Sequence, residues 1–303
     1  MLQDLIQDFK KNKPLLLMLL PSAVLLFIFS YIPMVGIIIA FQKFIPVKGL
    51  FGPQQWVGLD NFRYILMLPE FKDALWNTIR ISSMKIIGGL VVPVFFAILL
   101  NEIPISFLKR IIQTVFYLPH FLSWVILAGI FVDILSPSQG IVNRFIRTLG
   151  FQPIFFLGDN KWFPYVLVIT DIWKEFGFGT IVYLAAITSI DPSLYEAAMV
   201  DGANKWQQIR HITLPGMFPI IILMSVLSLG SILNANFDQV FNLYSPQVYK
   251  SGDVLDTLIY RIGLIDANYS LGTAIGLFKS GISFFLIATS YYLAYKFADY
   301  RIF

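Results

Sequence analysis

Six long apolar stretches restrict what this sequence can fold into. They cover roughly residues 15–41, 76–100, 112–135, 163–189, 215–237 and 272–297. Each is long enough for a helix to cross the hydrocarbon core of a bilayer, which takes about 20 residues. Only 13 % of the residues are charged and 57 % are hydrophobic, whereas a soluble domain has about 25 % charged residues. The sequence therefore predicts an all-α, polytopic membrane protein with six transmembrane helices.

A short polar segment precedes the first apolar stretch. It covers residues 1–14 and carries Lys10, Lys11 and Lys13. The stretch that follows is longer than the hydrophobic region of a signal peptide and has no small-residue cleavage site, so we interpret it as a retained span. We therefore expect a cytoplasmic N-terminal segment over 1–14 and a single transmembrane domain over 15–303.

The basic residues orient the chain only weakly. The two alternating sets of loops hold equal numbers of lysine and arginine, but the loops that would face outward are longer. Because basic residues in short loops weigh more in the positive-inside rule, their density favours a cytoplasmic N-terminus. With six spans, both termini then lie in the cytoplasm.

A compact polar segment at 190–214 separates the fourth and fifth stretches. Asp191 followed by Pro192 predicts the start of a helix, with Asp191 as N-cap and proline at the first helical position. This helix is expected to run to about Val200 and to end at Gly202, as a C-cap glycine would. One of its faces carries Leu194, Ala197, Ala198 and Asp201. The alanine pair makes that face flat, so that a partner can approach closely.

A second short helix is expected directly after this glycine. Asn204, with Gln207 three residues later, is close to a capping box and predicts a helix from Lys205 to about Ile212. The segment then enters the fifth stretch at Leu214-Pro215. On its own, such a helix-Gly-helix segment is also typical of a simple connector at the membrane surface.

The same segment resembles the EAA loop of the membrane subunits of binding-protein-dependent, ATP-driven importers. That motif has Glu-Ala-Ala, three residues, Gly, nine residues and Ile-x-Leu-Pro. Its fixed positions are filled here by Glu196, Ala197, Ala198, Gly202, Ile212, Leu214 and Pro215. The resemblance implies the fold of a type I ABC importer permease. In that family, the first short helix of the EAA loop docks on a cytoplasmic ATPase. The residues it implies in ATPase coupling are Glu196, Ala197, Ala198, Asp201, Gly202, Arg210, Leu214 and Pro215.

The resemblance also implies the partners. They are a second permease subunit of different sequence, two cytoplasmic ATPase subunits and an extracellular, lipid-anchored solute-binding protein, in a bacterial cell membrane. The chain has no Gly-Lys pair and therefore no phosphate-binding loop. We expect no cofactor in this chain, with ATP and magnesium on the partner ATPase. No catalytic, metal-binding or nucleic-acid-binding pattern occurs, and we expect His120 and His211 to be helix-end residues.

Ionisable residues occur inside the apolar stretches, where they are costly and therefore functional candidates. The fourth stretch holds Asp171, Trp173, Lys174 and Glu175. Asp171 and Lys174 are spaced for an ion pair on one helix face, and lining of a solute pathway is the alternative, with Trp173 and Glu175 as candidates. Lys279 is a further pathway candidate. Arg80 and Lys85 are expected to extend to an interface.

Polar and aromatic residues interleave at the end of the fifth stretch. The solute-pathway candidates there are Asn234, Asn236, Asp238, Gln239 and Phe241. Amides and carboxylates bind hydroxyl groups and aromatic rings stack on sugars, so this pattern is typical of a sugar site. A capped helix end at the outer interface is the alternative.

Several other segments are similar to permeases for complex oligosaccharides. They are 113–120, 183–192 and 269–279, together with Asn101-Glu-Ile and Ser123-Trp124. The resemblance therefore implies import of glycan or polysaccharide fragments. The alternatives are an ABC permease for a non-sugar solute, an ion-gradient-driven transporter that uses Asp171, Lys174 and Glu175 as a relay, and a non-transporting scaffold.

Overall fold

The computed structural model describes residues 12–298, which are mostly helical. The first part comprises α2 (Lys13–Leu26), η1 (Phe27–Tyr31), η2 (Ile32–Phe41), β1 (Gln42–Lys43), η3 (Pro46–Lys48), β2 (Gln55–Trp56), α3 (Asp60–Met67) and α4 (Pro69–Asn101). The middle part comprises α5 (Ser106–Tyr117), η4 (Leu118–Phe121), α6 (Trp124–Leu135), α7 (Ile141–Thr148), α8 (Phe163–Thr188), α9 (Pro192–Val200) and α10 (Lys205–Gln208). The last part comprises η5 (Ile209–Thr213), α11 (Leu214–Leu229), α12 (Phe237–Leu243), η6 (Pro246–Val248), α13 (Tyr249–Gly252), α14 (Leu255–Tyr260), η7 (Arg261–Ile265) and α15 (Tyr269–Ala298).

The helical fold class is confirmed, with one small antiparallel ladder besides the helices. In it, Gln42 of β1 pairs with Trp56 of β2, and Lys43 pairs with Gln55. The predicted N-terminal segment 1–14 lies mostly outside the described residues.

Within residues 12–298, four continuous helical segments are long and apolar enough to cross a membrane. They are Lys13–Phe41, Pro69–Asn101, Lys205–Leu229 and Tyr269–Leu293. A fifth span arises only if the pair Ser106–Phe121 and Trp124–Leu135, bent by 102° at its break, is counted as one. α8 has 26 residues, but its three ionisable residues near the middle make it less apolar than the others. The expected six stretches are therefore mostly helical, but two of them are interrupted and not all are plain apolar helices.

The third predicted span, 112–135, is wrong as a single helix. Helix begins earlier, at Ser106, and the chain turns at Leu122, whose backbone is extended. The new helix starts at Ser123, whose hydroxyl accepts a hydrogen bond from the Ile126 amide. Since Pro119 lacks an amide hydrogen and Ser123 supplies an N-cap, local chemistry favours a break in this apolar sequence.

The fifth predicted span, 215–237, is also wrong at its end. α11 stops at Leu229, and residues 230–236 form a non-helical segment, with turns over 230–233, before α12 begins at Phe237. Asn236 adopts the left-handed backbone conformation at φ 68° and caps α12 by accepting from the Gln239 amide. Short polar side chains tolerate this conformation and compete with helical hydrogen bonds, so the helix ends before the amides.

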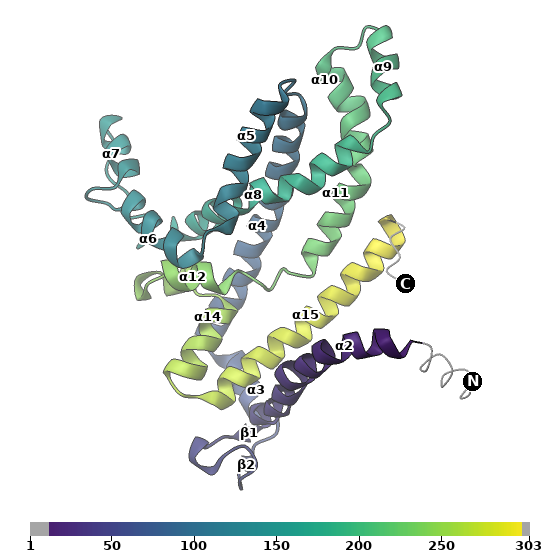
Figure 1. The fold of residues 1–303 in the computed structure, drawn as a ribbon. Helices are drawn as coiled ribbons and strands as arrows, with labels where there is room; N and C mark the ends of the chain where they lie inside the picture. Colours follow the sequence, from purple (N-terminus) through teal and green to yellow (C-terminus); the bar gives the residue numbers. More distant parts are fainter. Residues whose placement is uncertain (1–11, 299–303) are drawn as a thin grey trace.

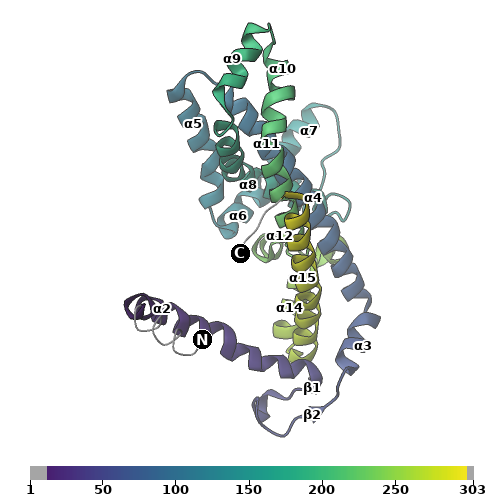
Figure 2. The same ribbon diagram turned by 90° about the vertical axis from the view of Figure 1, so that its right-hand side faces the viewer.

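The long helices cross one another to form an open frame (Figure 1). α9 and α10 lie at one end of the molecule, whereas β1, β2 and α3 lie at the opposite end. α2 extends sideways, away from the other helices (Figure 2). Its described side chains are all exposed, and only the η2 part of this segment packs closely on α15.

Buried clusters hold the frame together. One joins Ile81 of α4 to Phe163 and Leu167 of α8, all with no exposed area. Because lipid tails are as apolar as leucine, close packing and polar pairs hold membrane helices together more than the hydrophobic effect does. The polar contacts between α4, α8 and the 230–236 segment therefore help to hold these three segments together.

Candidate functional site

The EAA-like segment begins with a capped helix. The side chain of Asp191 accepts a hydrogen bond from the Ser193 amide at 2.9 Å and so starts α9, as the sequence predicts. That hydrogen bond holds the pKa of the Asp191 carboxyl below its ordinary value. The helix then runs from Pro192 to Val200 and stands free of the bundle at one end of the molecule (Figure 1).

A glycine turn separates α9 from α10. Gly202 has φ +76°, and a Cβ atom placed on it would have no neighbour within 4 Å, so backbone conformation rather than space selects glycine here. The Ala203 amide donates to the Ala198 carbonyl at 2.8 Å and closes the end of α9. The predicted C-cap role of Gly202 is confirmed.

α10 starts with the predicted capping box. Asn204 Oδ1 accepts from the Gln207 amide at 2.9 Å, and Gln207 Oε1 accepts from the Asn204 amide at 2.7 Å. The helix does not end near Ile212, however. It continues through the π-helical turn η5 into α11 without a break. Pro215 removes one hydrogen bond from this continuous helix, and the wider π-helical turn directly before it accommodates the proline.

Most of the proposed coupling residues face outward from this segment. Two of these residues, Ala198 and Leu214, are half-buried. The exposed ones are Glu196, Ala197, Asp201, Gly202, Arg210 and Pro215. Apolar side chains accompany them, with Met199 57 % and Trp206 69 % exposed. The segment therefore offers an open surface in which small, charged and apolar groups are mixed.

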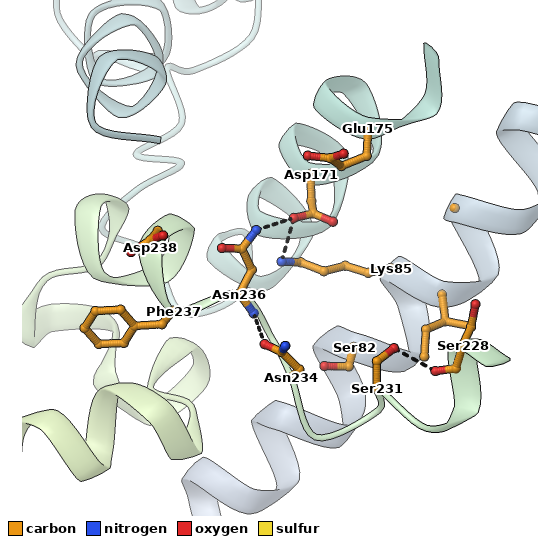
Figure 3. A pocket seen from close by; sticks show the side chains of 12 residues that line it. Ser82, Lys85, Asp171, Glu175, Ser228, Ser231, Asn234, Asn236, Phe237 and Asp238 are labelled. Carbon is orange, nitrogen blue, oxygen red and sulfur yellow. Dashed lines mark hydrogen bonds and ion pairs between the residues drawn. The ribbon is translucent and has the colours of Figure 1, made fainter. Parts of the chain in front are cut away.

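A polar cavity of about 560 Å³ lies between α4, α8, the end of α11 and the start of α12 (Figure 3). It is lined by Ser82, Lys85, Ile86, Gly89, Asp171, Glu175, Ser228, Ser231, Asn234, Asn236, Phe237 and Asp238. Four of the predicted pathway residues, Glu175, Asn234, Asn236 and Asp238, thus meet at one cavity although two helices and a turn segment supply them.

The prediction for Lys85 was wrong. This lysine does not extend to an interface but is only 8 % exposed. Its ammonium group donates to Asp171 at 3.1 Å, to the Ala235 carbonyl at 2.9 Å and to Gln239 Oε1. Figure 3 shows it extending from α4 toward α8. A lysine in the middle of one apolar stretch and an aspartate in another was the available signal for this pair.

The expected ion pair between Asp171 and Lys174 does not form. Asp171 faces α4 and also accepts from Asn236 Nδ2 at 3.3 Å. Lys174 instead bonds Glu175 at 3.0 Å and the carbonyl of His120 at 2.7 Å. The two residues are three positions apart on α8, but their side chains bond different partners.

His120 contacts the charged residues of α8 at the bend between α5 and α6. Its Nδ1 lies 2.6 Å from Glu175 Oε2, and its ring stacks on Phe178 with 4.1 Å between ring centroids. Lys174 lies over the Trp124 ring at 5.7 Å. The bend is therefore attached to α8 by both polar and aromatic contacts.

The remaining pathway candidates lie away from the polar cavity. Gln239 has no exposed area and donates to the Leu167 carbonyl at 2.7 Å and to Thr170 at 2.8 Å. Phe241 stacks on Phe237 and meets the Tyr260 ring edge-on. Lys279 pairs with Asp256 at 2.5 Å on another face. Trp173 lines a separate, wholly apolar cavity of about 590 Å³ beside α6.

The chain is similar to known transport proteins over nearly its whole length. The family described as "Binding-protein-dependent transport system inner membrane component" matches residues 89–302. Protein LplB of Bacillus subtilis (strain 168) is 40 % identical, over 95 % of this chain and 90 % of LplB. The polygalacturonan/rhamnogalacturonan transport system permease protein YteP of the same organism is 38 % identical, over 95 % of this chain and 90 % of YteP.

A solved structure has the same fold. It is a chain of a bacterial alginate ABC transporter in complex with an alginate pentasaccharide-bound periplasmic protein. That chain is 38 % identical, and the superposition covers 98 % of this chain and 99 % of that chain with a TM-score of 0.88. The expected type I permease fold is confirmed.

Membership of this family shows which subunit of a multi-subunit importer this chain is. Its members are permease subunits, ATP hydrolysis lies on separate ATPase subunits, and a partner permease and a binding protein complete the importer. The ion-gradient-driven alternative does not fit this membership. The chain belongs to the binding-protein-dependent inner membrane components and is a membrane-spanning permease subunit of an ABC importer.

Proposed function

We propose that this permease imports oligosaccharides, as fragments of larger glycans or polysaccharides. The observation that carries the proposal is the polar cavity, where the amides of Asn234 and Asn236 and the hydroxyl groups of Ser228 and Ser231 meet beside Phe237. A sugar entering a membrane protein exchanges its hydrogen bonds to water for bonds to protein groups, and unpaired hydroxyls are costly. Amides and hydroxyls both donate and accept, so they match either role of a sugar hydroxyl.

The similar proteins support this solute class. YteP is named for polygalacturonan and rhamnogalacturonan, and the solved relative is a chain of an alginate ABC transporter. In the proposal, Asn234, Asn236, Asp238 and Glu175 line the solute path. Gln239 does not line the path but stabilises its wall, because the Gln239 amide bonds Lys85 and the Leu167 carbonyl of α8.

The EAA-like segment is the proposed contact with the ATPase. Docking needs a surface that stands free, and α9 presents Glu196, Ala197 and Asp201 at the end of the molecule. ATP and magnesium then belong to the ATPase, and this chain holds no cofactor. Both termini lie on the cytoplasmic side with α9, whereas β1, β2 and α3 face the lipid-anchored binding protein outside.

Transport by the reconstituted importer tests the solute class. The permease pair, the ATPases and the binding protein are placed in liposomes with ATP inside, and uptake of labelled oligosaccharides is measured. Oligosaccharides should enter and stimulate ATP hydrolysis, whereas glycerol 3-phosphate and amino acids should not. Stimulation by one of those small solutes, with no response to any oligosaccharide offered, would refute the sugar proposal.

Cavity variants test the path separately. Asn234→Ala and Asp238→Ala remove groups that line the cavity without a buried bonding role. We expect each to lower the uptake rate while leaving the affinity of the complex for the loaded binding protein unchanged. Wild-type uptake by both variants would show that this cavity is not the path.

A further inference from the structure

A pair of hydroxyl groups joins α9 to the helix that leads into the fifth span. Tyr195 Oη lies 3.0 Å from Thr213 Oγ1, within hydrogen-bond distance. Thr213 is only 2 % exposed, whereas Tyr195 is half-buried in a helix whose other side chains mostly face outward. Among the hydrogen bonds of the described residues, this is the side-chain bond that connects α9 with η5. Neither residue occupies a fixed position of the EAA pattern.

The link that precedes α9 packs directly on α11. A Cβ atom at Gly216 would lie 2.5 Å from Ile190 Cδ1, so the backbone of α11 approaches the link before α9 as closely as glycine allows. Gln208 donates to the Ala203 carbonyl at 3.1 Å and fixes the turn between α9 and α10. The link before α9 and the turn after it are therefore both attached to the continuous helix α10–η5–α11.

α11 connects this seat to the polar cavity. Ser228, in its last turn, lines the cavity, and the segment that follows supplies Ser231, Asn234 and Asn236. A displacement of α11 along or about its axis therefore moves one wall of the cavity. The opposite wall, with Lys85 and Asp171, belongs to α4 and α8.

We propose that Tyr195 and Thr213 are positioning residues that transmit movement of α9 to α11, and through it to the cavity wall. The chain connection through Ser189 and Ile190 pulls on α8, and the hydroxyl pair adds a direct link to α11. Without it, α9 could tilt at the 189–191 link while α11 stays in place. This inference rests on the proposed docking of α9 to the ATPase, since only a helix that is moved has a movement to transmit.

Removal of single hydroxyl groups tests the link. Tyr195→Phe keeps the ring, and Thr213→Val keeps the shape of the side chain. In the reconstituted importer we expect normal co-purification of the ATPase with each variant. Solute-stimulated ATP hydrolysis and solute transported per ATP should fall about fivefold, the effect of one net hydrogen bond. The double variant should be no worse than either single variant, because both remove the same contact.

Two control variants separate transmission from packing. Thr188→Val makes the same chemical change on α8, where the hydroxyl bonds only the Ala185 carbonyl of its own helix, and should behave as wild type. Thr213→Ser keeps the hydroxyl but loses the methyl group, so it should retain coupling. A loss in Thr213→Ser as large as in Thr213→Val would assign Thr213 to packing and overturn the proposal.

The remaining outcomes are also decisive. Wild-type stimulation in Tyr195→Phe, or additive losses in the double variant, would overturn the link. If Thr213→Val does not assemble, Tyr195→Phe decides alone. The docking role itself is tested by Gly202→Val: retained ATPase binding and coupling there would refute the proposed docking of α9 on the ATPase. Wild-type coupling in the hydroxyl variants, with coupling lost in Gly202→Val, would refute only the hydroxyl link.

Discussion

The ammonium group of Lys85 and the carboxylate of Asp171 lie 3.1 Å apart, although the residues are 86 positions apart in the sequence. The pair joins α4 to α8 at membrane depth, and Asn236 and Gln239 complete its hydrogen bonds. It therefore holds together three segments that form the polar cavity.

Loss of one partner should be strongly destabilising. Lys85→Met leaves the half-buried Asp171 carboxylate without its counter-charge and should cost up to about 3–5 kcal/mol, the cost for a buried pair. The thermal unfolding midpoint of the purified permease pair measures the effect. Lys85→Met combined with Asp171→Leu should be milder than Lys85→Met alone, because no unpaired charge remains. An equal or larger loss in the double variant would contradict this account.

A surface pair provides the matched comparison. Lys205 lies 3.1 Å from Glu102, and its side chain is 72 % exposed. Lys205→Met should change stability by less than about 1 kcal/mol, since solvent screens exposed pairs. The same unfolding measurement checks it, and a shift as large as that of Lys85→Met would show that burial is not the deciding factor.

The backbone at Gly202 should control attachment of the ATPase. Its φ of +76° is strained for an L-residue by about 1–2 kcal/mol, so Gly202→Val should change the direction of α9 and weaken ATPase binding. Co-purification of the ATPase measures this. Gly202→Asn is the control, because asparagine tolerates the left-handed conformation, and it should retain more ATPase than the valine variant. Equal binding by both would argue against a backbone requirement.

Substitutions at Gln239 and Asn234 should have different effects, one on assembly and the other on the uptake rate. Gln239→Leu removes bonds to Lys85, Thr170 and the Leu167 carbonyl in a fully buried site, so it should lower the yield of assembled complex. Asn234→Leu should leave assembly intact and lower the uptake rate. Size-exclusion profiles and uptake assays separate the two effects. Normal assembly of Gln239→Leu would contradict the structural role of the amide.

Uptake should depend on ATP and not on ion gradients. In energised cells, an ionophore that collapses the proton and sodium gradients should leave uptake unchanged while ATP is maintained. Depletion of ATP with the gradients intact should abolish it. The opposite pattern would contradict an ATPase-driven mechanism.

The sequence by itself determined the features that depend on neighbouring residues. The helical class, the Asp191 cap, the Gly202 turn and the Asn204–Gln207 capping box are all fixed by groups within a few residues of one another. The EAA pattern is equally local, and so the family could be recognised from it. The break at Leu122 and the end of α11 at Leu229 also depend on nearby residues. They were missed because the high hydrophobicity of both stretches predicted unbroken helices and outweighed the capping signals of Ser123 and Asn236.

Only the tertiary structure decided which polar residues meet. Lys85 has no acidic residue near it in sequence, and its partners come from α8 and from the segment around Asn236. Which face of each helix points inward depends on the packing of all the other helices, and no local pattern encodes that rotation. The same holds for Tyr195 and Thr213, which are 18 positions apart and become neighbours because the chain reverses at Gly202. The cavity and its supporting contacts are therefore properties of the assembled fold.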